Sequence, residues 1–247
     1  MAEVRVFPDL QALSAAAAEA LAAVVREAVS GQDHFAVALA GGSTPRGLYQ
    51  ALATRYRDSF PWSAVHVFWG DERFVPPDDP ASNQRMAREA LLSRVPVPPS
   101  QVHPFPTALP DAQAAAEAYE TELRRVFTGD WPRFDLILLG LGDDGHTGSL
   151  FPGSPAVAER RRWVTVGEAP TEPRTRLTLT LPVLNHAARV WFLVSGASKR
   201  EALRRALSRE EPVTACPATG VQPTDGGLVW WVDEAAVGDS LHSLEVS

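Results

Sequence analysis

The sequence predicts an α/β protein of three layers, in which a mainly parallel, Rossmann-like sheet is covered by helices on both faces. Short β-branched runs alternate with segments rich in Ala, Leu, Arg and Glu along nearly the whole chain. Several of these runs are apolar on both faces, which is typical of strands buried in a parallel sheet. Glycine-bearing turns follow three of them, and ligands of open α/β sheets bind beyond such strand ends.

The first expected elements are a strand, a long helix and a second strand. VRVF (4–7) predicts the first strand, and the pattern over 10–30 predicts a helix that Gly31 can end as its C′ residue. FAVALAGG (35–42) is an apolar strand that runs into a glycine pair. The next helix should begin around Pro45.

The middle of the chain is richer in proline. VHVFWG (65–70) predicts a strand, and an irregular stretch follows it. Ser82 is the expected N-cap of a helix over 82–95. A proline-dense connection over 96–110 then leads to an amphipathic helix over 111–127.

The second half carries the most apolar expected strand, LILLGLG (136–142). After it we expect a strand, a short helix, a strand, a helix and a final strand, over 176–181, 182–188, 190–196, 198–207 and 228–233. No internal repeat, low-complexity tract or clear linker divides the sequence. We therefore expect a single domain over residues 1–247.

Composition argues against several functional classes. The formal net charge of −7 gives no global basic surface for nucleic acid. The lone Cys216 excludes an intramolecular disulfide framework and a cysteine metal cluster. No targeting segment is visible, and the alanine-rich stretch 15–25 is too short to span a bilayer. We expect a soluble cytoplasmic protein, monomeric or weakly homo-oligomeric, that binds neither membrane nor nucleic acid.

The AGGSTPRG loop is the first candidate for ligand binding. Gly41 and Gly42 lack Cβ atoms where the backbone turns, so a ligand can approach closely. Ser43 or Thr44 can cap the next helix, whose N–H groups and dipole would favour a phosphate. The loop is not a Walker A motif, because no Gly-Lys-Ser/Thr follows at the required spacing. An ordinary capped turn explains the pattern equally well.

The WGDERFVP loop is the second candidate. Asp71, Glu72 and Arg73 in a row suit a solvated turn, but their position between an apolar strand and Phe-Val-Pro favours a cleft. An arginine beside carboxylates is a preorganised fork for a phosphate or a developing oxyanion. Asn83 follows in SNQRM, either as a ligand contact or as a residue of the first helical turn.

The GDDGHTGS loop after the most apolar strand is the sharpest candidate. A histidine titrates near neutral pH, so His146 can take a proton from water. Asp144, two residues earlier, can orient the imidazole and stabilise its charged form. The alternative is a histidine that only ties down a turn. Asp143 could join both in holding a divalent ion, but three ligands on one tight loop rarely suffice, so we expect no metal and no cofactor.

Two further basic positions could serve an anion. Arg174 and Arg176 precede the LTLTL strand, and Lys199 begins the helix that Ser195 or Ser198 could cap. A lysine at a helix N-terminus opposes the helix dipole, which indicates a ligand role, but a solvated lysine in the first turn explains the position nearly as well.

These loops, in this order, resemble the 6-phosphogluconolactonase family of the glucosamine-6-phosphate isomerase/6-phosphogluconolactonase superfamily. The resemblance covers most of the chain between residues 37 and 207. Its segments are LAGGSTPRGLY, VFWGDERFVPPDDPASNQRMAREALL, FDLILLGLGDDGHTGSLFPGSP, PRTRLTLTLPVLNHA and VWFLVSGASKREALRRAL. The combination of GDERFVP with DGHTGSLFPG is specific, whereas GGSTP alone is not.

The resemblance implies a cofactor-independent lactonase of the oxidative pentose phosphate pathway, acting on a phosphorylated sugar lactone. It makes His146 the general base and places Arg73 and Lys199 near the phosphate or the carbonyl. A δ-lactone is an activated ester, so a base, a carbonyl donor and a phosphate anchor suffice. The expected catalytic residues are His146, Asp144 and Arg73, and the expected substrate-binding residues are Gly41, Gly42, Ser43, Thr44, Asp71, Asn83, Arg176 and Lys199.

Two rival functions remain. The sister family of glucosamine-6-phosphate isomerases continues GLGxDGH with Asn-Glu-Pro, where this chain reads TGSLFPG, and has Asp-Glu-Tyr in place of Asp71, Glu72 and Arg73. Both differences favour the lactonase. A non-catalytic sugar-phosphate sensor would need an attached helix-turn-helix domain, for which we see no room in 247 residues and the wrong net charge.

Overall fold

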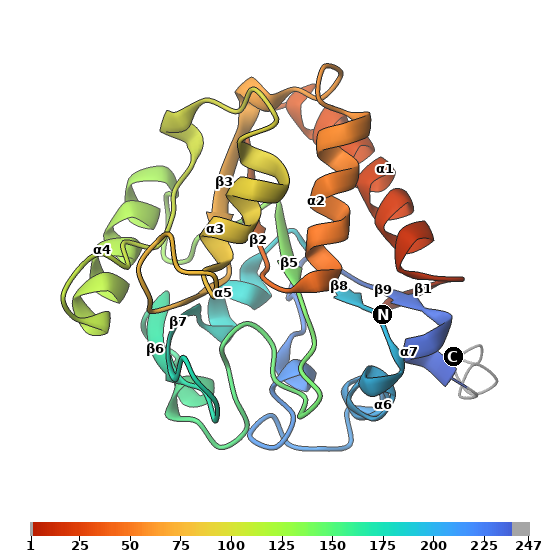
Figure 1. Cartoon of the computed structure of the whole chain (residues 1–247). Coiled ribbons are helices and arrows are strands. Elements are labelled where there is room, and N and C mark those ends of the chain that lie inside the picture. The colour runs from red at the N-terminus through yellow and green to blue at the C-terminus, as the bar shows by residue number, and fades with distance from the viewer. Residues whose placement is uncertain (1, 239–247) are drawn as a thin grey trace.

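The computed structural model describes residues 2–238, and its centre is a six-stranded sheet in which every neighbouring pair of strands is parallel (Figure 1). The strand order is β1-β9-β8-β5-β2-β3. The strands are β1 (Glu3–Phe7), β2 (Phe35–Leu39), β3 (Val65–Trp69), β5 (Leu136–Leu139), β8 (Arg189–Val194) and β9 (Gly227–Asp233). This confirms the predicted Rossmann-like sheet.

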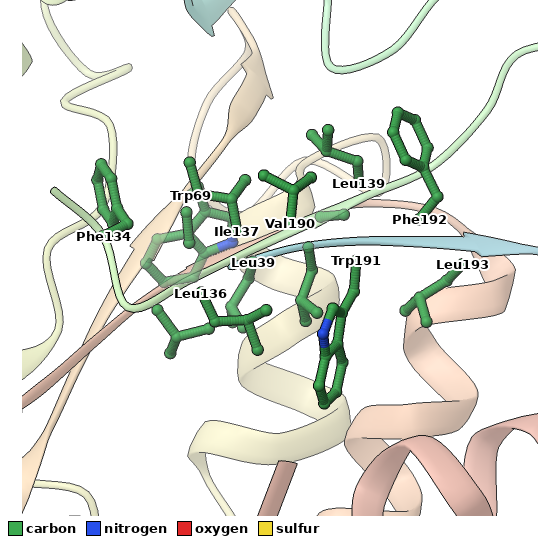
Figure 2. Packing of buried hydrophobic residues seen from close by; sticks show 14 of the residues in the cluster. Leu39, Trp69, Phe134, Leu136, Ile137, Leu139, Val190, Trp191, Phe192 and Leu193 are labelled. Atoms are coloured by element: carbon green, nitrogen blue, oxygen red, sulfur yellow. The ribbon is translucent and has the colours of Figure 1, made fainter. Parts of the chain in front are cut away.

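The strands β2 and β5 in the middle of this sheet are apolar throughout because helices cover both faces. All residues of β2 and β5 are buried, as are all but the first of β8. Figure 2 shows the side chains of β5 and β8 packed against Leu39, Trp69 and Phe134. The most apolar run of the sequence thus lies in the middle of the sheet.

The direction in which a crossover steps along the sheet determines which face of the sheet its helix covers. The connections from β1 to β2 and from β2 to β3 step one way along the sheet, whereas those from β5 to β8 and from β8 to β9 step the other way. Right-handed crossovers therefore place the two sets of helices on opposite faces. The helices are α1 (Leu10–Val29), α2 (Ser43–Arg55), α3 (Asn83–Ala87), α4 (Ala112–Val126), α5 (Leu181–His186), α6 (Arg200–Ser208) and α7 (Glu234–Val237).

The reversal of direction creates a crevice between β2 and β5. The connection after β2 leads away towards β3, and the connection after β5 leads away towards β8, so no loop closes over the gap between their carboxyl ends. Ligands of open α/β sheets bind at such switch points. The fold therefore places the two glycine-rich loops, after Leu39 and after Leu139, on opposite sides of one crevice.

A second, antiparallel sheet of three strands corrects the expected loop at 69–76. Its order is β4-β7-β6, formed by β4 (Asp71–Arg73), β7 (Thr175–Leu179) and β6 (Val164–Glu168). The N–H of Leu179 donates to the carbonyl of Gly70 at 2.8 Å, which joins this sheet to the end of β3. The WGDERFVP segment is therefore partly a strand, and the run 176–181 does not belong to the parallel sheet. β6 is not among the elements expected from sequence.

Several helix ends also differ from expectation. Gly42, with φ of 102°, is the N-cap of α2 and no side chain caps this helix, so the caps expected from Ser43 or Thr44 are wrong. Gly31 does occupy the expected C′ position, directly after the C-cap Ser30 of α1, but without a positive φ. Ser82 does cap α3, whose first turn continues as a π-helical stretch over Arg88–Leu92.

The helix expected over 198–207 also begins without a side-chain cap. α6 starts at Arg200 after a short 3₁₀ turn over Ala197–Lys199, whose N-cap is Gly196. The hydroxyl of Ser195 donates instead to the carboxylate of Asp233. The caps expected from Ser195 or Ser198 are therefore wrong. Among residues 2–238, no helix is long and apolar enough to cross a membrane.

Candidate active site

A cavity of about 250 Å³ lies beyond the carboxyl ends of β2 and β5. It collects residues from the loops named in the sequence, from β4 and from the turn before α6. Its lining is Ala40, Gly41, Gly42, Asp71, Arg73, Asn83, Leu139, Gly140, Leu141, Gly142, His146, Gly148 and Lys199. A neighbouring cavity of about 460 Å³ shares Gly42, Arg73 and Asn83 with it and includes Ser43. The fold thus brings three separate motifs to one crevice.

The loop after β5 makes a tight turn that presents an imidazole to this cavity. The N–H of Gly142 donates to the carbonyl of His146 at 2.8 Å, and the N–H of Gly145, whose φ is 89°, donates to the carbonyl of Gly142 at 3.0 Å. Gly142 is required by space, because a Cβ there would collide with the ring of His146. Gly142 and Gly145 therefore allow the turn that places His146 at the cavity.

Asp144 fixes the orientation of that imidazole. Its Oδ1 lies 2.6 Å from Nδ1 of His146 and accepts the backbone N–H of the same residue at 3.0 Å. The hydrogen bond from His146, more than any other contact, lowers the pKa of Asp144 to about 2, so the carboxylate is charged at neutral pH. The ring of Phe151 packs on the imidazole, with 4.4 Å between centroids. Since Nδ1 is engaged, Nε2 is the nitrogen that can accept a proton.

Glu72 of β4 serves the main chain and not the cavity. Only 1% of this residue is exposed, and its carboxylate accepts the backbone N–H groups of Arg73, Asn83 and Gln84 at 2.8, 2.7 and 2.7 Å. Burial raises the pKa of Glu72, and these N–H groups oppose that rise. Glu72 therefore fastens the start of α3 to β4 and holds the neighbouring residues of β4 in place.

Asp71 and Asn83 link the walls of the cavity. Oδ2 of Asp71 accepts the hydroxyl of Ser149 at 2.7 Å, and Nδ2 of Asn83 donates to the backbone carbonyl of Asp71 at 3.0 Å. A Cβ at Gly41 would collide with the amide of Asn83, so the first glycine loop lies directly against α3. Ser149 has no place among the residues expected from sequence, since its partner stands 78 residues earlier in the chain.

Two arginines lie opposite each other on β4 and β7. Arg73 and Arg176 are register partners, and one guanidinium nitrogen of Arg73 donates to the carbonyl of Ala81 at 2.5 Å. Arg176 is 7% exposed, and its Nε and Nη1 have no hydrogen-bond partner within residues 2–238. Burial, and then the charge of Arg73, lower the pKa of Arg176. Two close guanidinium groups, one of them incompletely paired, suit an anion. Arg174 lies apart and pairs with Glu168 at 2.6 Å.

Lys199 reaches the cavity from the turn before α6. Its Nζ lies 2.6 Å from Oδ1 of Asp143, and the hydroxyl of Ser198 lies 3.5 Å from the same oxygen. Asp143 therefore ties the loop of His146 to α6. Within the part of the chain that the structure describes, no three His, Cys, Asp or Glu side chains form a group that could hold a metal ion.

The N-terminus of α2 faces the crevice with its backbone. Gly42 lines both cavities, and Ser43 lines the larger one. The N–H groups of the first helical turn lack partners within the helix, and the glycine cap leaves them without a side-chain acceptor. Thr44 and Arg176, both expected to bind substrate, are not among the residues that line either cavity.

Comparison with known proteins gives a consistent result. A model of the family "Glucosamine-6-phosphate isomerases/6-phosphogluconolactonase" matches residues 8–230. The chain is 48% identical to 6-phosphogluconolactonase of Synechocystis over 221 residues, which cover 88% of this chain and 89% of that protein. It is 40% identical over 242 residues to 6-phosphogluconolactonase of Mycobacterium leprae, with 95% and 97% of the two chains covered.

Solved structures agree in fold over nearly the whole chain. That of 6-phosphogluconolactonase from Trypanosoma brucei has a TM-score of 0.89 and 32% identity, covering 98% of this chain and 99% of that one. A monomeric glucosamine-6-phosphate deaminase has a TM-score of 0.78 and 23% identity, covering 95% and 98% of the two chains. The latter likeness shows that the sister activity uses the same fold.

Proposed function

Because the chain belongs to the family of glucosamine-6-phosphate isomerases and 6-phosphogluconolactonases, we propose that it hydrolyses 6-phospho-D-glucono-1,5-lactone to 6-phospho-D-gluconate. This reaction belongs to the oxidative pentose phosphate pathway. The observation that carries the proposal is the 2.6 Å contact of Asp144 with His146, at a cavity that Arg73 and Lys199 also line. A base with a fixed tautomer and a set of cations are what hydrolysis of a phosphorylated lactone requires.

His146 is the general base of the proposed reaction. Asp144 accepts a hydrogen bond from the Nδ1–H group, so Nε2 takes a proton from water as the water oxygen bonds to C1 of the lactone. Charge develops on the carbonyl oxygen and is met by a cation of the site. The bond between C1 and the ring oxygen then breaks, and the imidazolium returns its proton to that oxygen.

The substrate phosphate is held by backbone and cations together. Gly41, Gly42, Ser43 and Thr44 supply the amide groups at the start of α2, which carry the positive end of the helix dipole. Arg73 and Lys199, which line the cavity, supply positive charge for the phosphate and for the developing oxyanion, and Arg176 adds charge as the register partner of Arg73 that is incompletely paired within residues 2–238. Asp71 and Asn83 also line the cavity, and we assign them to the sugar hydroxyls.

The cellular setting is part of the same proposal. We expect residues 1–247 to act as one domain, in the cytoplasm, as a monomer or a weak homo-oligomer, with no cofactor. Its partner is then a small phosphorylated lactone and neither a membrane nor a nucleic acid. Sedimentation of the purified protein at several concentrations tests the oligomeric state.

The activity is tested with freshly generated lactone, coupled to 6-phosphogluconate dehydrogenase, with glucosamine 6-phosphate as the second substrate. We expect lactone hydrolysis well above the spontaneous rate, unaffected by a chelator, and no deamination of glucosamine 6-phosphate. A rate no faster than buffer, from protein shown to be folded, would rule out the lactonase. Deamination without lactone hydrolysis would assign the chain to the sister activity.

A further inference from the structure

The loop of His146 rests on a segment beyond the motifs that indicate the function. The N–H of Ala218 donates to the carbonyl of Gly145 at 3.0 Å, and the N–H of Gly153 donates to the carbonyl of Thr214 at 2.8 Å. The buried Cys216 lies directly under Gly145, where a Cβ would come within 2.7 Å of its sulfur. Residues 214–218 therefore form a platform for the catalytic loop.

Arg205 of α6 joins this platform to the loop. Its guanidinium makes a two-point ion pair with Glu211, at 2.7 Å from Nε and 2.6 Å from Nη2. Nη2 also donates to the carbonyl of Ala215 at 3.1 Å, and Nη1 donates to the backbone carbonyl of Asp144 at 3.3 Å. One side chain thus connects α6, the platform and the residue that orients His146.

The shape of this contact set suits arginine. The planar guanidinium directs its N–H groups in fixed directions, so two can pair with Glu211 while others reach the carbonyls of Ala215 and Asp144. The ammonium of lysine is a single point charge on a flexible stem and cannot keep all three partners. The Arg205 side chain is 20% exposed, so much of it is screened from solvent.

We infer that Arg205 is a positioning residue for catalysis, which acts by holding the backbone of Asp144. The side chain of Asp144 fixes Nδ1 of His146, so a shift of its main chain moves the base relative to the substrate. Displacements of about 1 Å at a reacting group cost on the order of 100-fold in rate. The inference rests on the proposed roles of Asp144 and His146, and it assigns no contact with substrate to Arg205.

α6 offers a matched control for the test. Arg204 also pairs with a glutamate at two points, Glu201, at 3.1 and 2.7 Å. Unlike Arg205, it is exposed and makes no hydrogen bond with the catalytic loop in the described structure. Arg204→Met and Arg205→Met therefore remove similar ion pairs from one helix, and only the second removes the hydrogen bond to Asp144.

The experiment compares steady-state kinetics of wild type, Arg204→Met, Arg205→Met and Arg205→Lys, each normalised to folded protein. We expect Arg205→Met to lower kcat about 10-fold to 100-fold with KM changed less than about twofold, Arg205→Lys to lie between, and Arg204→Met to match wild type. Equal kcat for folded Arg205→Met and wild type, with only the melting temperature lowered, would overturn the inference. If Arg205→Met does not fold, the kcat and KM of Arg205→Lys and Glu211→Gln are compared with those of Arg204→Met and wild type instead.

A second measurement does not depend on activity. The Nδ1 proton of His146, shared with Asp144, gives its own signal in ¹⁵N-resolved NMR spectra of the free protein. We expect the signal to shift in Arg205→Met and to keep its position in Arg204→Met. An unchanged signal in Arg205→Met would contradict the inference. A shifted signal in a protein without lactonase activity would keep the positioning role and reject the proposed function.

Discussion

Two acidic segments, Asp71–Arg73 and Asp143–His146, follow strands of the same sheet and have different roles. In the first, the carboxylate of Glu72 is buried and binds three backbone N–H groups. In the second, the half-exposed carboxylate of Asp144 binds the imidazole of His146 at the cavity. The pKa of Glu72 is raised by burial, whereas that of Asp144 is lowered by its histidine.

This difference shows that the partner of a carboxylate decides its role more than its place in the sequence. Glu72 holds β4 to the start of α3, so its substitution should lower the free energy of unfolding. In the proposed mechanism Asp144 orients the base His146, so substitution of Asp144 should lower the rate. Substitutions in the two segments can therefore be ranked by their expected effect on catalysis.

The largest effect should come from removing the base. His146→Ala is expected to lower kcat by about 10³-fold, since general-base catalysis contributes on this order. The melting temperature should fall only slightly, through loss of the contacts of the ring with Asp144 and Phe151. The coupled lactone assay and thermal unfolding measure the two quantities. Retention of more than about a tenth of the wild-type kcat would remove His146 from the proposed role.

Removal of the orienting charge should have the second largest effect on kcat. Asp144→Asn keeps the size of the side chain but loses the negative charge that favours the required tautomer, and we expect kcat to fall by about 100-fold in the coupled lactone assay.

The pH dependence of stability provides a second test of Asp144. The lowered pKa of Asp144 adds stability that is present above its ordinary value of 3.8 and is lost as the pH falls towards about 2. Acid unfolding curves of variant and wild type should therefore separate above that range and converge below it.

Displacement of the imidazole should have a smaller effect. In Gly142→Ala the new methyl group collides with the ring of His146, which must move from Asp144, and we expect kcat to fall about tenfold. Gly227→Ala is the control, because a Cβ there meets nothing within 4 Å and lies at the start of β9. Equal kcat values for the two variants would mean that the loop adapts without cost.

Substitution of Glu72 in the first segment should lower the stability and leave kcat nearly unchanged. Glu72→Gln leaves fewer acceptors for the backbone N–H groups, so the free energy of unfolding should fall by about 3 kcal/mol. The kcat of the remaining folded protein should stay within about twofold of wild type. Urea unfolding and kinetics normalised to folded protein measure both. A normal unfolding free energy with a large loss of kcat would place Glu72 in the chemistry.

The smallest effect concerns a histidine cluster apart from both segments. Nδ1 of His66 lies 3.1 Å from Nε2 of His103, whose Nδ1 faces Glu122 at 2.9 Å, and His34 packs edge-on against His66. Burial, then the charges of His103 and His34, lower the pKa of His66 below 6.5. The unfolded chain then binds the proton first, so stability should fall as the pH drops below about 6.5. His66→Gln should reduce this slope; an unchanged slope would exclude the contribution.

The fold could largely be predicted because its main signal is local. The apolar runs at 35–42 and 136–142 predict the interior strands β2 and β5, and the run at 65–70 predicts the edge strand β3, because strands covered by helices on both faces are apolar throughout. The small antiparallel sheet was harder to foresee. β4 has three residues, two of them acidic, and pairs with β7 about a hundred residues later. Nothing within either segment indicates that pairing.

In the site, too, contacts between neighbouring residues could be predicted and contacts between distant segments could not. The contact of Asp144 with His146 spans two residues on one turn and was expected. The cap of α2 was assigned to the wrong residue, because a serine or threonine cap is the common solution and the glycine of this turn replaces it. Arg205 could not be found from sequence, since it acts on a backbone carbonyl that no residue type specifies.

A crystal structure with bound 6-phosphogluconate tests the central assignment most directly. We predict the C1 carboxylate within about 3 Å of Nε2 of His146, and the phosphate at the start of α2 with at least one of Arg73, Arg176 and Lys199. A phosphate against His146, or a carboxylate bound away from it, would contradict the division between a loop that performs the chemistry and the surrounding elements that hold the substrate.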